Sequence, residues 1–187
     1  MVAERQPFLA PERSHVARYA LASKRIAKGA KVLDVFCGSG YGAKVLADRG
    51  HKVTAFDSCN SFPIVEGVTF LESSYPASDF QDGWFDSVIA FEAIEHVHRG
   101  MGLNLLHSIR KWLKPGGTLW LSTPNQDVIP FDAKRFPFHR LHYTPKELER
   151  MLVSAGFPQV KWLSQAKKGS VLFKPGPSGA YMVAEAR

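Results

Sequence analysis

Residues 32–42 read VLDVFCGSGYG, an apolar run that passes into a glycine-rich turn. Residues 31–36 predict a strand buried on both faces of a parallel sheet, because their apolar side chains are nearly continuous. Asp34 interrupts the run. A buried carboxylate is costly unless it accepts hydrogen bonds, so we expect a ligand or a turn as its partner. Glycines permit positive φ and close backbone approach, and residues 41–49 predict the helix that follows. The stretch therefore predicts one half of a Rossmann-like fold.

A second acidic residue closes the next apolar run. Residues 52–56 predict a strand, and Asp57 follows it, 23 residues after Asp34. In a Rossmann-like fold this position carries the carboxylate that binds a ribose diol. The two carboxylates are therefore expected to flank one cleft for a nucleotide-like cofactor.

In this order the motifs resemble those of the class I S-adenosylmethionine-dependent methyltransferases, over roughly the whole chain. The resemblance implies that the DxxCGxG turn holds the methionine part of S-adenosylmethionine and that Asp57 binds the ribose hydroxyls. Rossmann dehydrogenases are the alternative, but their glycine turn wraps a pyrophosphate, which an acidic strand end would repel. NAD is therefore disfavoured. The expected cofactor-binding residues are Asp34, Cys37, Gly38, Ser39, Gly40, Asp57, Ser58, Ser74, Phe91 and Glu92.

The resemblance implies an α/β fold with a Rossmann-like seven-stranded, mostly parallel sheet, an antiparallel last strand and helices on both faces. The helix after Thr144 is marked by a capping box, with Pro145 at its first position and Glu147 at its third. The other elements follow from apolar periodicity. Strands are expected at residues 68–71, 84–91, 118–122, 160–165 and 181–186, and helices at 12–28 and 103–113.

Length and composition suit one domain over residues 1–187, with 1–30 as an N-terminal helical cap, because 45% hydrophobic content supports a sizeable core. Cys37 and Cys59 follow neither a metal-site spacing nor a disulfide framework. With no secretory segment or long apolar span, we expect a cytoplasmic protein without a membrane partner. The net charge of +7 suits a polyanionic partner or simple solubility, and solubility is favoured because no nucleic-acid motif accompanies it.

The segment EAIEH follows the strand expected at residues 84–91. It places Glu92, Glu95 and His96 at i, i+3 and i+4, so a helix would present all three on one face. Two carboxylates and an imidazole suit a divalent cation such as Mg²⁺ or Mn²⁺, or a general base. The structural alternative is that Glu92 polarises the cofactor pocket and His96 simply packs.

Two branches of the family carry ExxEH at this place, associated with a divalent metal: the small-RNA 3′-terminal ribose 2′-O-methyltransferases and the O-methyltransferases of ubiquinone biosynthesis. The RNA branch adds a histidine just before a Thr-containing helix start, and residues 138–145 here read FHRLHYTP. The resemblance implies His139 in that role, with His142 as a nearby substitute. The expected metal ligands are Glu92, Glu95, His96 and His139, and the expected catalytic residues are Glu95, His96 and His139.

Two other segments are expected to cover the cleft. Residues 126–143 are aromatic, basic and long for a connection, which is typical of a substrate-covering loop. The N-terminal stretch HVARYALA is similar to the HxxRYxxA of methyltransferases associated with glycan biosynthesis, so His15, Arg18 and Tyr19 are expected either to close over the cofactor or to pack on the sheet.

Together these features predict an S-adenosylmethionine-dependent O-methyltransferase that acts on a small-molecule or sugar hydroxyl, with or without a divalent metal. Without a metal, His96 or His139 would act as the base. RNA ribose 2′-O-methylation is the alternative, and it predicts salt-sensitive binding to a polyanion. A protein that binds the cofactor without transferring its methyl group is the third option.

Overall fold

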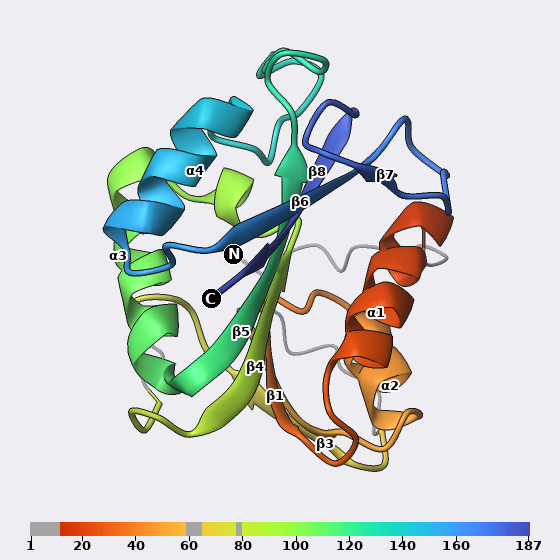
Figure 1. Ribbon diagram of the computed structural model, residues 1–187, viewed down its shortest axis with the longest axis vertical. Coiled ribbons are helices and arrows are strands. Elements are labelled where there is room, and N and C mark those ends of the chain that lie inside the picture. Colours follow the sequence, from red (N-terminus) through yellow and green to blue (C-terminus); the bar gives the residue numbers. More distant parts are fainter. Residues whose placement is uncertain (1–11, 59–64, 78–79) are drawn as a thin grey trace, which may run out of the picture.

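A computed structural model describes residues 12–58, 65–77 and 80–187. An eight-stranded sheet runs through its centre in the order β3-β2-β1-β4-β5-β8-β6-β7, with helices on both faces (Figure 1). Strands β1 to β5 pair in parallel, and β8 lies antiparallel between β5 and β6. The expected Rossmann-like fold is confirmed, and the two-residue β7 is an addition to it. The strands are β1 (Lys31–Val35), β2 (Lys52–Asp57), β3 (Val68–Glu72), β4 (Phe85–Phe91), β5 (Leu113–Pro124), β6 (Val160–Gln165), β7 (Lys174–Pro175) and β8 (Tyr181–Ala186).

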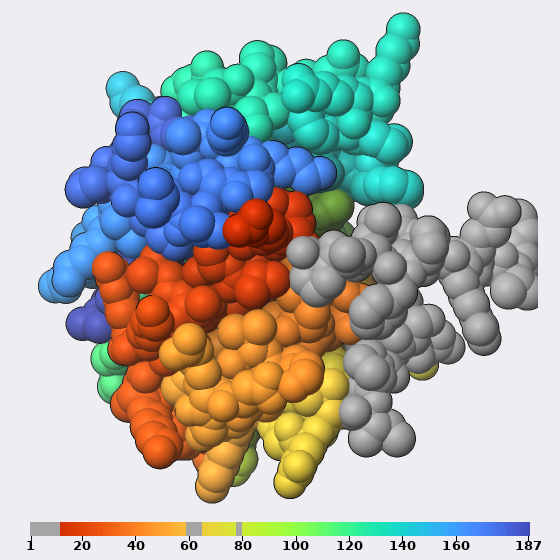
Figure 2. Space-filling model, turned by 90° about the vertical axis from the view of Figure 1, so that its right-hand side faces the viewer, coloured from red at the N-terminus to blue at the C-terminus, as the bar shows by residue number. Residues whose placement is uncertain are grey.

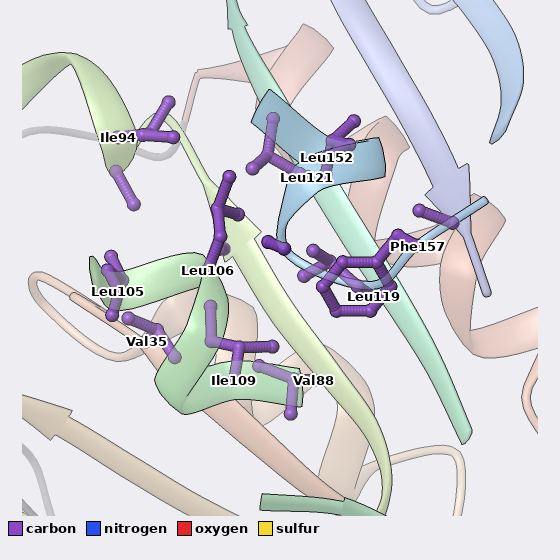
Figure 3. Packing of buried hydrophobic residues seen from close by; sticks show 14 of the residues in the cluster. Val35, Val88, Ile94, Leu105, Leu106, Ile109, Leu119, Leu121, Leu152 and Phe157 are labelled. Atoms are coloured by element: carbon purple, nitrogen blue, oxygen red, sulfur yellow. The ribbon is translucent and has the colours of Figure 1, made fainter. Parts of the chain in front are cut away.

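The central strands β1 and β4 are buried on both faces, and alternate residues enter two different cores. On β1, Leu33 packs with the helices α3 (Arg99–Trp112) and α4 (Pro145–Ser154), whereas Val32 packs with α1 (Arg13–Arg25) and α2 (Tyr41–Ala47). Strand β4 divides in the same way at Val88 and Ile89. Figure 3 shows the first core, where Leu105, Leu106 and Ile109 of α3 meet the strands.

The capping box of α4 forms as expected. Glu147 donates its backbone N–H to the Thr144 hydroxyl oxygen at 3.2 Å, and Thr144 donates its N–H to the Glu147 carboxylate at 3.0 Å. At α1, the carboxylate of Glu12 accepts from the backbone N–H of Ser14 and acts as the N-cap. Helix α1 is shorter than expected and ends at Arg25.

The segment expected to place three ligands on one helical face is not an α-helix. Only Ile94–His96 forms a short 3₁₀ turn, η1, and Glu92 lies before it with a positive φ of 50°. Because Glu92 leaves the helical path, its side chain takes a different direction from those of Glu95 and His96.

The connection between β5 and α4 has the irregular form that its composition predicts. It projects beyond the carboxyl end of β5 at the top of Figure 1, and it is fixed to η1 where the Arg140 N–H donates to the Glu95 carbonyl at 2.7 Å. Phe138 is exposed on it. Within the parts of the chain that the structure describes, no helix is both long and apolar enough to cross a membrane.

Candidate functional site

The glycine-rich turn is fixed to the end of the neighbouring strand. The Gly38 N–H donates to Asp57 Oδ2 at 2.9 Å, and the Cys37 N–H donates to the Phe56 carbonyl at 3.1 Å. Gly40 begins α2 with a φ of 77°, a left-handed conformation that a glycine adopts without strain. The turn therefore lies against the carboxyl ends of β1 and β2, with Ser58 next to Asp57.

Asp34 is fully buried beneath this turn. Its Oδ1 accepts a 2.9 Å hydrogen bond from the Tyr19 hydroxyl, and its Oδ2 has no hydrogen-bond partner among the described residues. Burial raises the pKa of Asp34 to about 7, Asp57 adds to the increase, and the Tyr19 hydrogen bond opposes it. A cationic ligand group at Oδ2 would stabilise the charged form.

Helix α1 packs beside α2, the helix that follows the turn. Figure 2 shows α1 in red, packed beside α2 in orange. Gly42 is required for this packing, since a Cβ there would lie 2.1 Å from Cζ of Tyr19. His15 contacts the Tyr41 hydroxyl through Nδ1, and its ring lies 5.5 Å from that of Tyr41 between centroids. Burial lowers the pKa of His15 to about 4, so the ring is neutral at pH 7.

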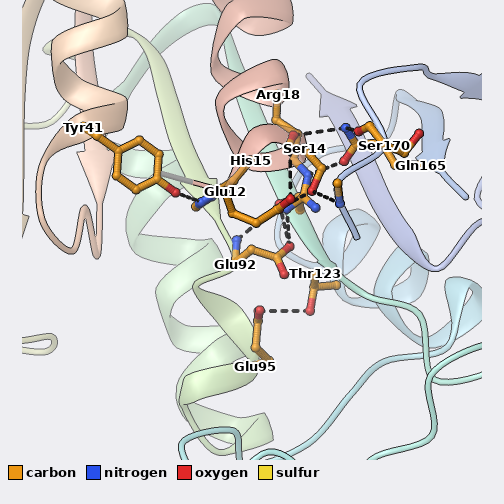
Figure 4. Close-up of polar contacts among 12 residues, drawn as sticks. Glu12, Ser14, His15, Arg18, Tyr41, Glu92, Glu95, Thr123, Gln165 and Ser170 are labelled. Atoms are coloured by element: carbon orange, nitrogen blue, oxygen red, sulfur yellow. Dashed lines mark hydrogen bonds and ion pairs between the residues drawn. The ribbon is translucent and has the colours of Figure 1, made fainter. Parts of the chain in front are cut away.

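Arg18 is a buried cation at the centre of a polar network (Figure 4). Its Nη1 donates to Glu92 Oε1 at 2.6 Å and to the Ser122 hydroxyl at 3.0 Å, and its Nε donates to Gln165 Oε1 at 2.7 Å. The guanidinium also lies 4.7 Å from the centre of the Tyr181 ring. Sequence analysis did not assign roles to Ser122 and Gln165, because no local pattern links them to a helix more than a hundred residues earlier.

Glu95, His96 and His139 meet at the carboxyl end of β4. Each offers one potential ligand atom, and these three atoms lie within 4.8 Å of one another. Glu95 is fully buried: Oε2 accepts from the Thr123 hydroxyl at 3.0 Å, while Oε1 has no partner in the described part of the chain. His96 and His139 are close, with ring centroids 4.9 Å apart.

Three other expected site residues lie outside this cluster. Glu92 does not join the potential ligand atoms, because Arg18 and Ser122 hold its carboxylate. The Phe91 side chain is buried against Tyr19, at 5.0 Å between ring centroids. Ser74 is exposed beyond the end of β3. Cys59 lies outside the described residues.

Burial also changes the acidities within the cluster. It raises the pKa of the Glu95 carboxyl well above its usual range, and the nearby charge of Glu92 adds to this effect. It lowers the pKa of His139 to about 4, together with the neighbouring His96 and His142. At pH 7 His139 is therefore a neutral imidazole, and Glu95 favours a proton or a cation at its unpartnered oxygen.

The residues fit both groups that the family resemblance implies. The Asp34 oxygen that has no partner among the described residues suits the amino group of S-adenosylmethionine, and Asp57 lies at the carboxyl end of β2, where Rossmann-like folds carry a carboxylate for a ribose. The unpartnered oxygen of Glu95 and two imidazoles form a donor set of the kind that Mn²⁺ and Zn²⁺ accept.

A cavity of about 540 Å³ lies at the opposite end of the sheet. Two of the four cationic residues that line it, Arg25 and Lys114, pair with Glu185 and Asp86, at 2.8 and 2.6 Å. Ligands of open α/β sheets bind at the carboxyl ends of the strands. We therefore place the cofactor cleft beside the glycine turn and not in this cavity.

Sequence comparison identifies relatives. The family described as "Methyltransferase domain" matches residues 2–161. A probable S-adenosylmethionine-dependent methyltransferase from Mycolicibacterium smegmatis is 30% identical over 168 residues, covering 81% of this chain and 62% of the relative. A ubiquinone biosynthesis O-methyltransferase from Xanthomonas campestris is 36% identical over 121 residues, covering 59% of this chain and 50% of the relative. The chain thus spans about half to three fifths of the length of these relatives.

Solved structures share the fold. A putative methyltransferase from Haloferax volcanii, in complex with the Trm112 methyltransferase activator, superposes with a TM-score of 0.74 at 17% identity, covering 93% of this chain and 89% of that one. A 1,6-didemethyltoxoflavin-N1-methyltransferase from Burkholderia thailandensis, with bound S-adenosylhomocysteine, gives 0.68 at 22% identity, covering 93% and 78%. At these sequence identities, the structural similarity establishes the fold of this chain and nothing about its activity.

Proposed function

The chain belongs to the class I S-adenosylmethionine-dependent methyltransferase family, and on that premise we propose that it transfers a methyl group to a hydroxyl of a small molecule, at a divalent metal held by Glu95, His96 and His139. The similarity to a protein named as a ubiquinone biosynthesis O-methyltransferase supports an oxygen acceptor on a small molecule. The family match also supports the prediction of an enzyme.

One observation carries the proposed metal site. One oxygen of the buried Glu95 carboxylate and one nitrogen of each imidazole lie within 4.8 Å of one another at the carboxyl end of β4, and Glu95 Oε1 has no hydrogen-bond partner among the described residues. A buried, unpaired carboxylate is costly unless something satisfies it. A cation at this point offsets that cost.

Two groups of residues at the carboxyl ends of the strands would have separate roles, one toward the cofactor and one toward the metal. Asp34 and Asp57 bind and orient S-adenosylmethionine, which supplies the methyl group to be transferred. Glu95, His96 and His139 would hold a divalent metal, which would supply Lewis-acid chemistry that eases loss of the hydroxyl proton to water. The loop 126–143 covers the acceptor. Most of the rate enhancement is expected from positioning the hydroxyl in line with the methyl group.

The acidity of His139 distinguishes a ligand from a base. A general base works best when its pKa lies near the working pH, and the pKa of about 4 for His139 lies well below it. A neutral imidazole with an available lone pair is instead the form that binds a metal. We therefore favour the ligand role for His139 over the base role.

The test is methyl transfer from labelled S-adenosylmethionine to catechol, a probe with vicinal hydroxyls, and to cell extract separated into small-molecule and RNA fractions. Each reaction is run with Mn²⁺ and with EDTA. We expect label in the small molecules that is lost with EDTA. Glu95→Gln should remove the metal-dependent label, whereas Glu149→Gln, an exposed change on α4, should retain it.

Other outcomes would change the proposal. Label that is insensitive to EDTA and to Glu95→Gln would exclude the metal site and leave a metal-independent methyltransferase. Label in RNA, with binding that weakens steeply as salt rises, would favour the ribose methyltransferase alternative. Cofactor binding without transfer to either fraction would favour a passive binding protein.

A further inference from the structure

His142 stands behind His139 and is itself almost fully buried, with 3% of its surface exposed. Its Nδ1 lies 2.6 Å from the carbonyl oxygen of Ile129, and its Nε2 lies 2.8 Å from Nδ1 of His139. Phe131 and Phe136 pack against the ring, at 5.6 and 4.8 Å between centroids. Two successive hydrogen bonds, between Ile129 and His142 and between His142 and His139, therefore connect the backbone of the covering loop with the proposed metal site.

When both imidazoles are neutral, these two hydrogen bonds allow one arrangement of protons. A carbonyl oxygen accepts only, so Nδ1 of His142 carries a hydrogen. Neutral imidazole has one N–H, so Nε2 of His142 is a lone pair and accepts from Nδ1–H of His139. The remaining nitrogen of His139, Nε2, then has its lone pair available.

His96 is arranged in the same sense without a second histidine. Its Nδ1 lies 3.0 Å from the carbonyl oxygen of Phe138, so this nitrogen is the donor, and in the neutral form of the ring Nε2 carries the lone pair. In both histidines Nδ1 is therefore engaged in a hydrogen bond, which leaves Nε2 as the nitrogen that could bind a metal. His96 takes its tautomer directly from the backbone, whereas His139 takes it through His142.

We propose that His142 is a positioning residue that fixes His139 as the Nδ1–H tautomer and so keeps its Nε2 lone pair available to the site. Phe136 stacks on His139 at 5.2 Å and limits tilting of the ring, but it has no acceptor that would select a tautomer. The hydrogen bond from His139 to His142 selects the tautomer, because Nε2 of His142 accepts the hydrogen on Nδ1 of His139. This role rests on the proposed function only insofar as the lone pair is used by a metal, because the tautomer exists without one.

The experiment measures the histidine tautomers directly. Long-range ¹H–¹⁵N correlation spectra of the metal-free protein, labelled at histidine, show which ring nitrogen of each imidazole carries hydrogen. In the unsubstituted protein we expect His139 protonated at Nδ1 only. His142→Phe fills the same aromatic site without an acceptor, so His139 should change to Nε2–H. His142→Gln retains an acceptor oxygen and should restore Nδ1–H.

Mn²⁺ titration of the same proteins supplies the second readout. Loss of a residue that orients a metal-bound histidine typically lowers affinity 10- to 100-fold. We expect a decrease of this order in His142→Phe and a much smaller one in His142→Gln. The matched control is His51→Phe, which removes another buried histidine that faces a carbonyl, that of Ser23 at 3.2 Å, on the other side of the molecule from the cluster. It should change neither the His139 tautomer nor Mn²⁺ binding.

The outcomes separate this inference from the proposed function. An Nε2–H tautomer of His139 in the unsubstituted protein, or Nδ1–H retained in His142→Phe, overturns the role of His142 whether or not Mn²⁺ binds. The expected tautomers together with no Mn²⁺ binding support the role of His142 and overturn the metal site. If His142→Phe does not fold, the unsubstituted protein and His142→Gln still decide, because both must show Nδ1–H.

Discussion

Arg18 of α1 donates a 2.6 Å hydrogen bond to Glu92, the residue that follows β4. The pair joins the N-terminal helix to the strand end that leads into the candidate metal site. It also explains why Glu92 is absent from the ligand cluster: its carboxylate already neutralises a cation that is 1% exposed. The two residues lie 74 positions apart in the sequence.

Arg18→Gln should destabilise the protein by about 2 to 4 kcal/mol. Breaking a buried ion pair by removing one partner costs roughly 3 to 5 kcal/mol, and the 21% exposure of the Glu92 side chain lets water offset part of that cost. Urea denaturation measures the difference. Arg13→Gln, an exposed change on the same helix, should stay within about 0.5 kcal/mol, and equal losses in the two variants would contradict a special role for Arg18.

Gly42→Ala should weaken both the fold and cofactor binding. The added Cβ would lie 2.1 Å from the Tyr19 ring, so α1 must shift and the hydrogen bond from Tyr19 to Asp34 must lengthen or break. Overpacking of this kind costs about 1 to 3 kcal/mol. Thermal unfolding and calorimetric titration with S-adenosylmethionine measure the two effects. At Gly100, in the first turn of α3, nothing lies within 4 Å of an added Cβ, so Gly100→Ala should be neutral or slightly stabilising.

Asp34 makes the stability of the cofactor-free protein depend on pH. Its folded-state pKa of about 7 exceeds the usual 3.8, so between these values the folded protein retains a proton that the unfolded chain has lost. This contribution to stability therefore falls as pH rises from about 4 to about 7. Asp34→Asn removes this pH dependence. The free energy of unfolding of the variant should therefore rise relative to that of the unsubstituted protein across the window, by at most about 4 kcal/mol. Urea denaturation at a series of pH values tests this, with the exposed Asp82→Asn as control, and a difference that stays constant with pH would refute it.

Asp57→Ala should lower affinity for S-adenosylmethionine about 10- to 100-fold. A hydrogen bond to a charged group contributes roughly 1.5 to 3 kcal/mol, and the same carboxylate holds the Gly38 N–H of the turn. Calorimetric titration measures the affinity. Asp48→Ala, at the exposed end of α2, is the control and should bind as the unsubstituted protein does. Unchanged affinity in Asp57→Ala would remove the ribose assignment.

Much of the fold was predictable because the relevant signals are local. The apolar run before Asp34 and the glycines after it specify a strand and a turn, and Thr144 with Glu147 specifies a helix start. These patterns depend on neighbours within a few residues, and local physical chemistry determines them. The structure places each of these elements within a few residues of its predicted position.

The site was less predictable because its partners are distant in the sequence. The spacing of Glu92 and Glu95 predicts one helical face, but Glu92 has a positive φ and turns toward Arg18, for which no local pattern exists. His139 was identified through the family resemblance. The contact between His139 and His142 depends on how a loop without repeating structure folds back on itself, which periodicity does not describe.

The contacts of α1 have a consequence for synthesis on the ribosome. Arg18 and Ser14 bond to Gln165 on β6, and Arg25 pairs with Glu185 on β8. The helix is thus translated well before β6 and β8, which hold these polar partners. Until residue 165 has left the exit tunnel, Arg18 lacks part of the surroundings that compensate its buried charge. The nascent chain is therefore expected to fix α1 beside the glycine turn only after β6 and β8 have been translated, when the turn and the acidic strand ends are already available.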